Sequence, residues 1–154
     1  MDLGDLLKPE GVFASLRVKN KKQALRELAN RAGRITQLDE RQIFDTLLQR
    51  ERLGSTAVGR GIAIPHARIV GLDRIATVFA QLDELIDFEA PDGEPVDLVF
   101  VLLAPEQAGA DHLKALARIS RVLRDPLSLE KLRAARDRDA LYSVLTEPMA
   151  SHAA

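Results

Sequence analysis

The sequence contains no cysteine, so disulfide bonds and thiolate metal sites are excluded. It also lacks an excess of positive charge: 22 basic and 23 acidic residues give a formal net charge of −1, which provides no electrostatic reason to propose nucleic acid as a partner. No apolar run approaches the roughly 20 residues that a membrane-spanning helix needs. The first residues lack the basic and apolar regions of a secretory signal. We therefore expect a cytoplasmic protein that does not insert into a membrane.

What is present is an ordinary globular composition. Hydrophobic residues make up 46% of the 154 residues and charged residues 29%, which is enough apolar material for one sizeable core. No internal repeat or linker divides the chain. We expect a single domain over residues 1–147, followed by a disordered tail at residues 148–154.

Capping residues and helical periodicity predict two helices in the first third of the chain. Asn20 is a suitable N-cap for a helix that starts at Lys21, and we expect this helix to stop at Gly33. Asp39 is the N-cap of the second helix, with Gln42 at the capping-box position.

Strands are predicted where the apolar period changes to two. An early strand is predicted over residues 12–18. Three glycines in eight residues predict a loop over residues 54–61, and the short strand that follows over residues 62–65 is expected to end at its proline. Apolar runs predict two buried strands over residues 75–82 and 97–103, the second covered on both faces.

Helical stretches also close the chain, and we expect them over residues 111–124, 127–135 and 137–145. Helices before, between and after the apolar strands favour an α/β domain. We expect a mixed β-sheet flanked by helices on both faces.

His66 is the histidine best placed for chemistry. It follows Pro65, whose fixed φ gives the backbone a defined direction beside the glycine-rich loop. A phosphoryl group on an imidazole nitrogen needs charge-assisted donors and backbone N–H groups around it. The neighbouring sequence supplies arginines and hydroxyls, namely Arg60, Arg68, Ser55 and Thr56. The alternative is a surface histidine after a turn proline.

His112 lies near the start of a predicted helix, on the apolar face that Ala115 and Ile119 share. The N-terminal end of a helix disfavours an imidazolium and favours anions. This suits a histidine that hydrogen-bonds a phosphoryl oxygen or the other histidine, and the alternative is a histidine at the core edge, satisfied by the backbone. His152, beside the C-terminus, is expected to be exposed and inert.

Arg50 is the third candidate. It lies in the last turn of its predicted helix, three residues after Leu47, from where it can reach toward the glycine-rich loop. The alternative is an ordinary basic residue that the helix dipole favours at a C-terminus. We expect its neighbours Glu51 and Arg52 to be solvated.

Two other kinds of site find little support in the sequence. His66 and His112 are 46 residues apart without HExxH spacing, and a catalytic zinc normally takes three protein ligands. No Gly-x-Ser-x-Gly elbow is present for a nucleophilic triad. We expect neither a metal nor another cofactor.

The whole run from Arg50 to Arg68 resembles the active-site signature of the enzyme IIA domains of the bacterial phosphotransferase system, fructose–mannitol class. Its segment Gly-Ile-Ala-Ile-Pro-His-Ala-Arg is similar to the nitrogen-regulatory branch, the IIA-Ntr proteins. The run over residues 98–105 and the block over residues 112–120 resemble the second histidine block of the family. The resemblance extends from about residue 3 to about residue 145.

The resemblance implies a mixed sheet sandwiched by helices and a set of site residues. His66 matches the histidine that accepts a phosphoryl group at the tele nitrogen, Nε2, from an HPr-like carrier charged by phosphoenolpyruvate through enzyme I. His112 matches the second active-site histidine, and Arg50 matches the arginine that faces the same site. Ser55, Thr56 and Arg68 are possible loop contacts.

The resemblance also implies a phosphocarrier whose phosphorylation state controls partners such as potassium-transport proteins or sensor kinases. Because no membrane or IIB domain is fused to it in this sequence, we expect regulation rather than transport. The alternative is a sugar-specific IIA subunit of a fructose- or mannitol-type transport system. A binding module that uses phosphorylation only as a switch and a metal-dependent hydrolase are further hypotheses.

Overall fold

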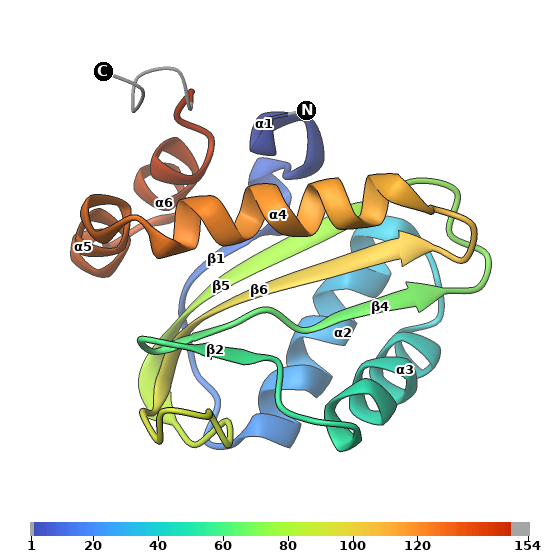
Figure 1. Ribbon diagram of the computed structural model, residues 1–154, viewed down its shortest axis with the longest axis horizontal. Coiled ribbons are helices and arrows are strands. Elements are labelled where there is room, and N and C mark those ends of the chain that lie inside the picture. Colours follow the sequence, from blue (N-terminus) through green and yellow to red (C-terminus); the bar gives the residue numbers. More distant parts are fainter. Residues whose placement is uncertain (1, 149–154) are drawn as a thin grey trace.

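A mixed β-sheet forms the centre of the computed structural model, which describes residues 2–148 (Figure 1). Its strands are β1 (Val12–Leu16), β2 (Ala57–Gly59), β3 (Ile62–Ala63), β4 (His66–Ile69), β5 (Ala76–Ile86) and β6 (Val96–Pro105). The strand order is β1-β5-β6-β3-β2, and β4 also pairs with β6. Strand β5 is antiparallel to β6, whereas β3 and β4 are parallel to β6 and β1 is parallel to β5.

Helices cover both faces of this sheet, so the expected fold class is confirmed (Figure 1). One face carries α2 (Lys21–Thr36) and α3 (Glu40–Arg52). The other carries α1 (Leu3–Leu6), α4 (Ala110–Arg124), α5 (Pro126–Ala134) and α6 (Arg138–Leu145). A short 3₁₀-helix, η1 (Pro9–Gly11), leads into β1, and neither it nor α1 was predicted from the sequence.

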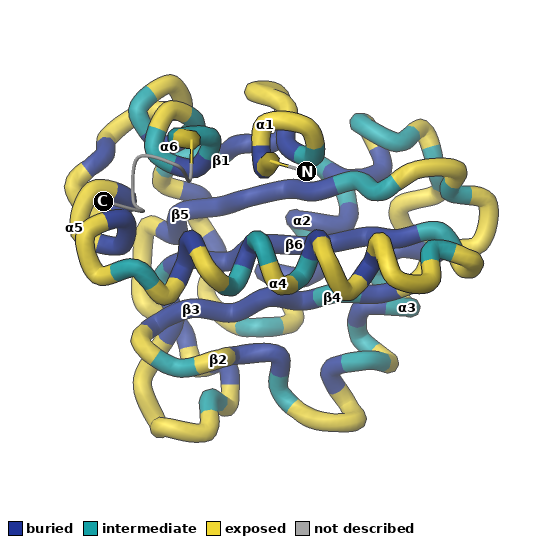
Figure 2. The backbone as a smooth tube through the Cα atoms, turned by 45° about the horizontal axis from the view of Figure 1, so that its top comes forward, coloured by how far each residue is buried: buried dark blue, intermediate teal, exposed yellow. Residues whose placement is uncertain are grey.

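Strand β6 supplies side chains to both cores. Within residues 98–103 the odd-numbered side chains pack beneath α2 and α3, and the even-numbered ones pack beneath α4. All of them are closed to solvent, and Figure 2 shows β5 and β6 as buried strands between the helices. The prediction of a strand covered on both faces is confirmed.

The prediction that Gly33 ends the first long helix is wrong. Helix α2 continues to Thr36, and Gln37 ends it with a left-handed φ of 61° and an N–H that donates to the Gly33 carbonyl. Gly33 allows a close approach instead. A Cβ there would lie 3.1 Å from the carbonyl oxygen of Leu38 and 3.2 Å from the Cβ of Glu40, so the chain entering α3 passes directly over it.

Asp39 caps α3 as predicted, because its side chain accepts from the N–H of Arg41. The capping box is wrong, however. Gln42 turns away from the cap and donates through Nε2 to the carbonyl of Val70, 3.2 Å away, which ties α3 to the chain after β4.

The predicted loop over residues 54–61 contains ordered structure. Strands β2 and β3 pair there as a hairpin, and its two turn residues, Arg60 and Gly61, have φ values of 60° and 79°. Positive φ at both positions is the signature of a type I′ turn, the turn that best matches the twist of paired strands. The glycine count indicated a turn correctly but hid β2, whereas the short strand predicted after the loop is present as β3.

The strand before Pro65 ends at Ala63, two residues earlier than predicted, but the expectation that the chain leaves the sheet after Pro65 is wrong. Proline cannot donate to a ladder, but the carbonyl of Pro65 accepts from the N–H of Leu102 at 2.9 Å. Pairing with β6 then resumes, with His66 opposite Leu102 and Ile69 opposite Pro105. His66 therefore begins a strand rather than leaving the sheet.

The other predicted strands and helices are present with shifted ends, and the sequence runs mainly underestimated β5 and β6. The expected disordered tail begins at Pro148, and its residues 149–154, with His152, lie outside the described part of the chain. Within residues 2–148, no helix is long and apolar enough to cross a membrane.

Candidate functional site

His66 and Arg68 project from β4 toward the face of the sheet that α4 covers. Side chains alternate along a strand, and Ala67 and Ile69 pack in the core beneath α2 and α3. His66 and Arg68 alternate with these two residues along β4, so their side chains must point to the opposite face. This placement follows from the ladder with β6, which the sequence analysis did not foresee.

The imidazole of His66 is held by the backbone. Its Nδ1 lies 2.8 Å from the carbonyl oxygen of Ile64. A carbonyl only accepts, so we assign the proton to Nδ1. The other nitrogen, Nε2, is then unprotonated and carries the lone pair that a nucleophile needs.

His112 comes to the same place from α4. Its ring centroid lies 5.9 Å from that of His66, and the two ring planes meet at 51°. It lies in the first turn of α4 and is buried, as its place on the apolar face predicted. Two histidines that are far apart in the sequence thus share one site.

The tautomer of His112 follows from a missing partner. Its Nδ1 is buried without a hydrogen-bond partner among the described residues. A buried N–H without an acceptor is rarer than an unpaired acceptor, so we assign the lone pair to Nδ1 and the proton to Nε2. His112 then has an N–H to offer to an anion beside His66.

Burial lowers the pKa of His112, and electrostatic interactions with His66 and Arg68 lower it further. These causes keep His112 neutral, which is the form that the assigned tautomer requires. Arg68 itself donates from Nη1 to the carbonyl of Glu106, 3.1 Å away, in the connection between β6 and α4.

The N-terminus of α4 adds a further positive end. Gly109 precedes the helix with φ 57° and ψ −127° and provides no side-chain cap. The Asp111 N–H donates to the carbonyl of Ala108, and no side-chain hydrogen bond caps the helix at Gly109. The partial positive charge of the α4 dipole is therefore available near His112.

The structure does not bring Arg50 into hydrogen-bond contact with either histidine. Its Nη1 donates instead to the carbonyl of Gly54, 2.9 Å away, across the C-terminus of α3. This bond agrees with the alternative of a basic residue at a helix end. It also holds a half-exposed guanidinium at the start of the glycine-rich segment.

The hydroxyls of Ser55 and Thr56 are used in local structure. Ser55 Oγ donates to the carbonyl of Phe88 at 2.6 Å and accepts from the N–H of Ala57. Thr56 is buried, and its hydroxyl bonds to Glu51. Both residues therefore fix the loop rather than offer a donor to a ligand.

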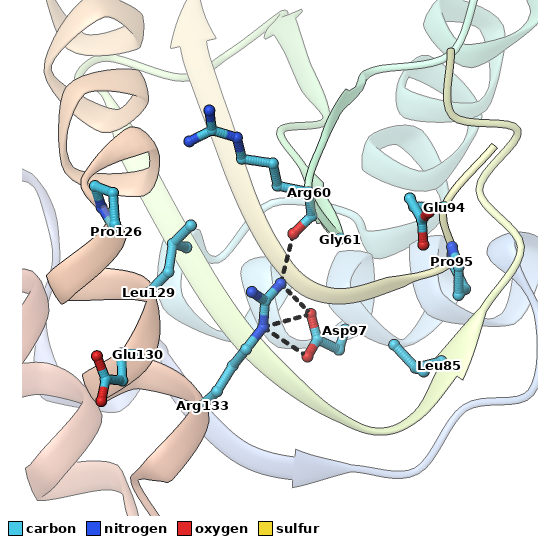
Figure 3. A pocket seen from close by; sticks show the side chains of 10 residues that line it. All are labelled: Arg60, Gly61, Leu85, Glu94, Pro95, Asp97, Pro126, Leu129, Glu130 and Arg133. Carbon is cyan, nitrogen blue, oxygen red and sulfur yellow. Dashed lines mark hydrogen bonds and ion pairs between the residues drawn. The ribbon is translucent and has the colours of Figure 1, made fainter. Parts of the chain in front are cut away.

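Arg60 belongs to a different part of the surface. It lies in the β2–β3 turn and lines a pocket of about 580 Å³, which neither histidine lines (Figure 3). There Arg133 donates to both oxygens of Asp97 and, at 2.6 Å, to the carbonyl of Arg60. This pairing stabilises the turn.

The expectation that Glu51 is solvated is wrong, and sequence reasoning missed its importance. Its side chain is 2% exposed and forms an ion pair of 2.7 Å with Lys21. A signal was present, because Ile43, Leu47 and Glu51 follow one another at a spacing of four and all three are buried. An acidic residue on the apolar face, at the unfavourable end of the helix dipole, is a candidate for a specific partner.

A metal centre is not evident in the described structure. Within residues 2–148, no three side chains of His, Cys, Asp or Glu gather in a way that could hold a metal ion. The paired histidines, the Arg68 charge and the α4 dipole together favour a site for a dianionic group on a histidine.

Comparison with known proteins places the chain in a family. The sequence matches the family described as phosphoenolpyruvate-dependent sugar phosphotransferase system, EIIA 2, over residues 5–147. The chain belongs to this family of phosphotransferase system proteins.

Within the family, the chain is similar to proteins of the nitrogen-regulatory type. It is 58% identical over 153 residues to the nitrogen regulatory protein of Bradyrhizobium diazoefficiens, a match that covers 99% of this chain and 100% of the relative. The crystal structure of the nitrogen regulatory protein IIA-Ntr from Neisseria meningitidis superposes with a TM-score of 0.88 at 33% identity, over 94% of this chain and 99% of that one. The resemblance found in the sequence is confirmed.

The family also includes sugar-specific proteins. The fructose-specific EIIABC component of Bacillus subtilis is 31% identical over 148 residues, which is 96% of this chain but only 23% of the relative. The present fold thus corresponds to one part of that longer protein.

Proposed function

We propose that this protein is a phosphocarrier that reversibly accepts a phosphoryl group on Nε2 of His66. The observation that carries the proposal is the pairing of the two histidines, with Nδ1 of His66 bonded to the Ile64 carbonyl and Nε2 left bare. The family to which the chain belongs is a phosphotransferase family. Membership in this family implies that the phosphoryl donor is an HPr-like phosphohistidine protein.

The chemistry asks mainly for position and charge. Nε2 of His66 attacks phosphorus in line, the bond to the donor's imidazole nitrogen breaks, and its electron pair returns to the donor. The proton on Nδ1 stays where the Ile64 carbonyl holds it. Because no proton must move, orientation of the ring carries much of the rate.

The charge that arrives on His66 has partners nearby. The Nε2–H of His112 and the N-terminus of α4 offer hydrogen-bond donors and a positive dipole end. The guanidinium of Arg68 already acts on this site, since its charge contributes to the lowered pKa of His112. Arg50 would join these partners of the phosphoryl group only by giving up its hydrogen bond to the Gly54 carbonyl.

The assay is phosphoryl uptake from phosphoenolpyruvate, enzyme I and an HPr-like donor. We expect acid-labile phosphate on the wild type and on His152→Ala, and none on His66→Ala. His112→Gln should still be phosphorylated, but ~10-fold or more slowly, because it loses one oriented donor. Uptake by His66→Ala at the wild-type level would refute the assignment.

We propose further that the phosphorylation state controls partner proteins, for which potassium-transport proteins and sensor kinases are the candidates. The support is the similarity to proteins named nitrogen regulatory protein. A phosphoryl group adds about two negative charges at the surface and changes which partner fits there. Binding of these candidates to wild type, His66→Ala and His66→Glu should differ, and identical affinities would remove the switch.

A sugar-specific IIA role is the second candidate, favoured by the similarity to the fructose-specific EIIABC component. The two roles differ in the next acceptor. A transport subunit passes its phosphoryl group rapidly to a IIB domain. We expect slow or no transfer from the phosphorylated protein to a fructose-type IIB domain, and rapid transfer would favour the transport role.

A further inference from the structure

A buried ion pair anchors the segment that leads to His66. Glu51, in the last turn of α3, pairs through Oε2 with Nζ of Lys21 at the start of α2, and the two atoms are 2.7 Å apart. The other carboxylate oxygen, Oε1, accepts from the hydroxyl of Thr56 and, at 3.0 Å, from its backbone N–H. The carboxylate is thus bonded on both oxygens by charge-assisted hydrogen bonds.

A run of hydrogen bonds continues from Thr56 to the imidazole ring. The carbonyl of Thr56 accepts from the N–H of Ile64 at 3.0 Å. The carbonyl of Ile64 then accepts from Nδ1 of His66 at 2.8 Å. Each step passes through the backbone of one residue, so this run connects the position of Thr56 to the carbonyl that holds the ring of His66.

The same anchor connects three other parts of the fold. Nζ of Lys21 lies 5.0 Å above the ring of Phe88 and 3.3 Å from Glu89, just after β5. Ser55 donates to the carbonyl of Phe88 from the other side. The start of α2, the end of α3 and the segment after β5 therefore meet at the loop before the site.

Stability alone does not explain an acidic residue at position 51. The last turn of a helix disfavours a negative charge, and burying a carboxylate carries a desolvation penalty that an apolar side chain avoids. An apolar residue at this position would continue the stripe of Ile43 and Leu47. It could not accept hydrogen bonds from Thr56.

We propose that Glu51 is a positioning residue for His66. It holds Thr56, and through Thr56 and Ile64 it fixes the ring direction of His66 and keeps the proton on Nδ1, so that Nε2 faces the donor. Lys21 balances its charge, so the anchor adds no net negative charge behind the phosphoryl site. This inference rests on the proposed phosphocarrier function.

The test compares Glu51→Gln with a matched control. Glutamine keeps an acceptor oxygen but gives up the charge that binds Lys21 and one acceptor. The control is Gln81→Leu, which removes another buried side chain with three hydrogen bonds. Its Nε2 donates to the carbonyls of Leu132 and Ala135, and its Oε1 accepts from the N–H of Ser15. Thr56→Val, which removes only the hydroxyl, tests the same connection more gently.

Two readouts separate positioning from general destabilisation. The first is the rate of a single phosphoryl transfer from the HPr-like donor, measured at several donor concentrations to give a maximal rate constant (kcat) and a half-saturating concentration (KM). The second is the ¹⁵N spectrum of the unphosphorylated His66 imidazole, which distinguishes the two neutral tautomers. Both are measured below the unfolding transition of each variant.

We expect Glu51→Gln to lower kcat ~10-fold or more with KM changed less than about twofold, because misorientation affects the reaction more than docking. Its His66 spectrum should shift from the Nδ1–H form toward a mixture, with a smaller shift for Thr56→Val. Gln81→Leu should keep both readouts at wild-type values. An unchanged kcat and spectrum in Glu51→Gln, or equal losses in Gln81→Leu, would overturn the inference.

Failure of the proposed function would look different. In that case the wild type itself would take up no phosphate on His66. The ¹⁵N spectra of the wild type and Glu51→Gln would still show whether Glu51 sets the tautomer of His66.

Discussion

Acidification should destabilise this protein through His112. Burial, His66 and Arg68 all lower the pKa of His112 in the folded state. In the unfolded chain the same side chain titrates near pH 6.5. Below that pH the unfolded state therefore binds a proton that the folded state refuses, and the free energy of unfolding must fall.

The size of the effect has an upper limit. The contribution is fully present above about pH 6.5 and is lost as the pH falls toward the lowered pKa of folded His112, with a slope of at most about 1.4 kcal/mol per pH unit. From about pH 7.5 to about pH 5.5 the loss is thus at most about 1.4 kcal/mol. Solvent around the half-exposed His66 screens part of the repulsion, so we expect about 0.5–1 kcal/mol.

The measurement is urea unfolding at several pH values and constant ionic strength, for the wild type and His112→Gln. Groups that do not face His112 titrate equally in both proteins, so the difference between the two pH profiles reports His112 together with its interaction with His66. In a His66→Gln background the repulsion from His66 is absent, so the pKa of His112 should be lowered less. The pH range over which His112 destabilises the protein should then be narrower. Parallel profiles for wild type and His112→Gln would show that the buried imidazole does not resist protonation.

Two further pairs of substitutions test how local geometry supports the fold. Gly61→Ala should destabilise by about 2–3 kcal/mol in urea unfolding, because its φ is +79° and a Cβ would lie 2.6 Å from the guanidinium of Arg133 and 3.0 Å from Asp97. Gly93 has a similar φ of +75° with open space around it, so Gly93→Ala should lower the free energy of unfolding by only about 1 kcal/mol. Equal losses at the two glycines would mean that the contact with Arg133 contributes nothing. Asn20→Ala removes the N-cap hydrogen bond of α2 and should lower the free energy of unfolding by about 1 kcal/mol, whereas Asn20→Ser should largely restore it.

Elements defined by local chemistry were predictable from the sequence. The N-caps at Asn20 and Asp39 mark the starts of α2 and α3 correctly. The continuous apolar run in β6 indicated burial on both faces. The helical spacing around His112 placed it on the buried face of α4. In each case the neighbours within one or two turns determine the outcome.

Features that depend on distant partners were not predictable. Gly33 looks like a helix stop until the chain entering α3 is seen to cross it. Pro65 looks like a strand end, but β6 supplies a donor to its carbonyl and continues the ladder at His66. Glu51 looks solvated because Lys21 is thirty residues away. The candidate site combines both outcomes. The rings of the two histidines lie together, as the resemblance implied, but Arg50 bonds to the carbonyl of Gly54 instead of to either histidine.

The central place of β6 has a consequence for the order of events while the chain is being synthesised. Strands β3, β4 and β5 all leave the ribosome earlier, yet each hydrogen-bonds to β6, so the sheet cannot close until β6 follows them. The helix that carries His112 comes directly after β6. His66 therefore emerges before its partner, and the proposed phosphoryl site is complete only when most of the chain has been synthesised. A chain cut short before α4 should be inert rather than partly active.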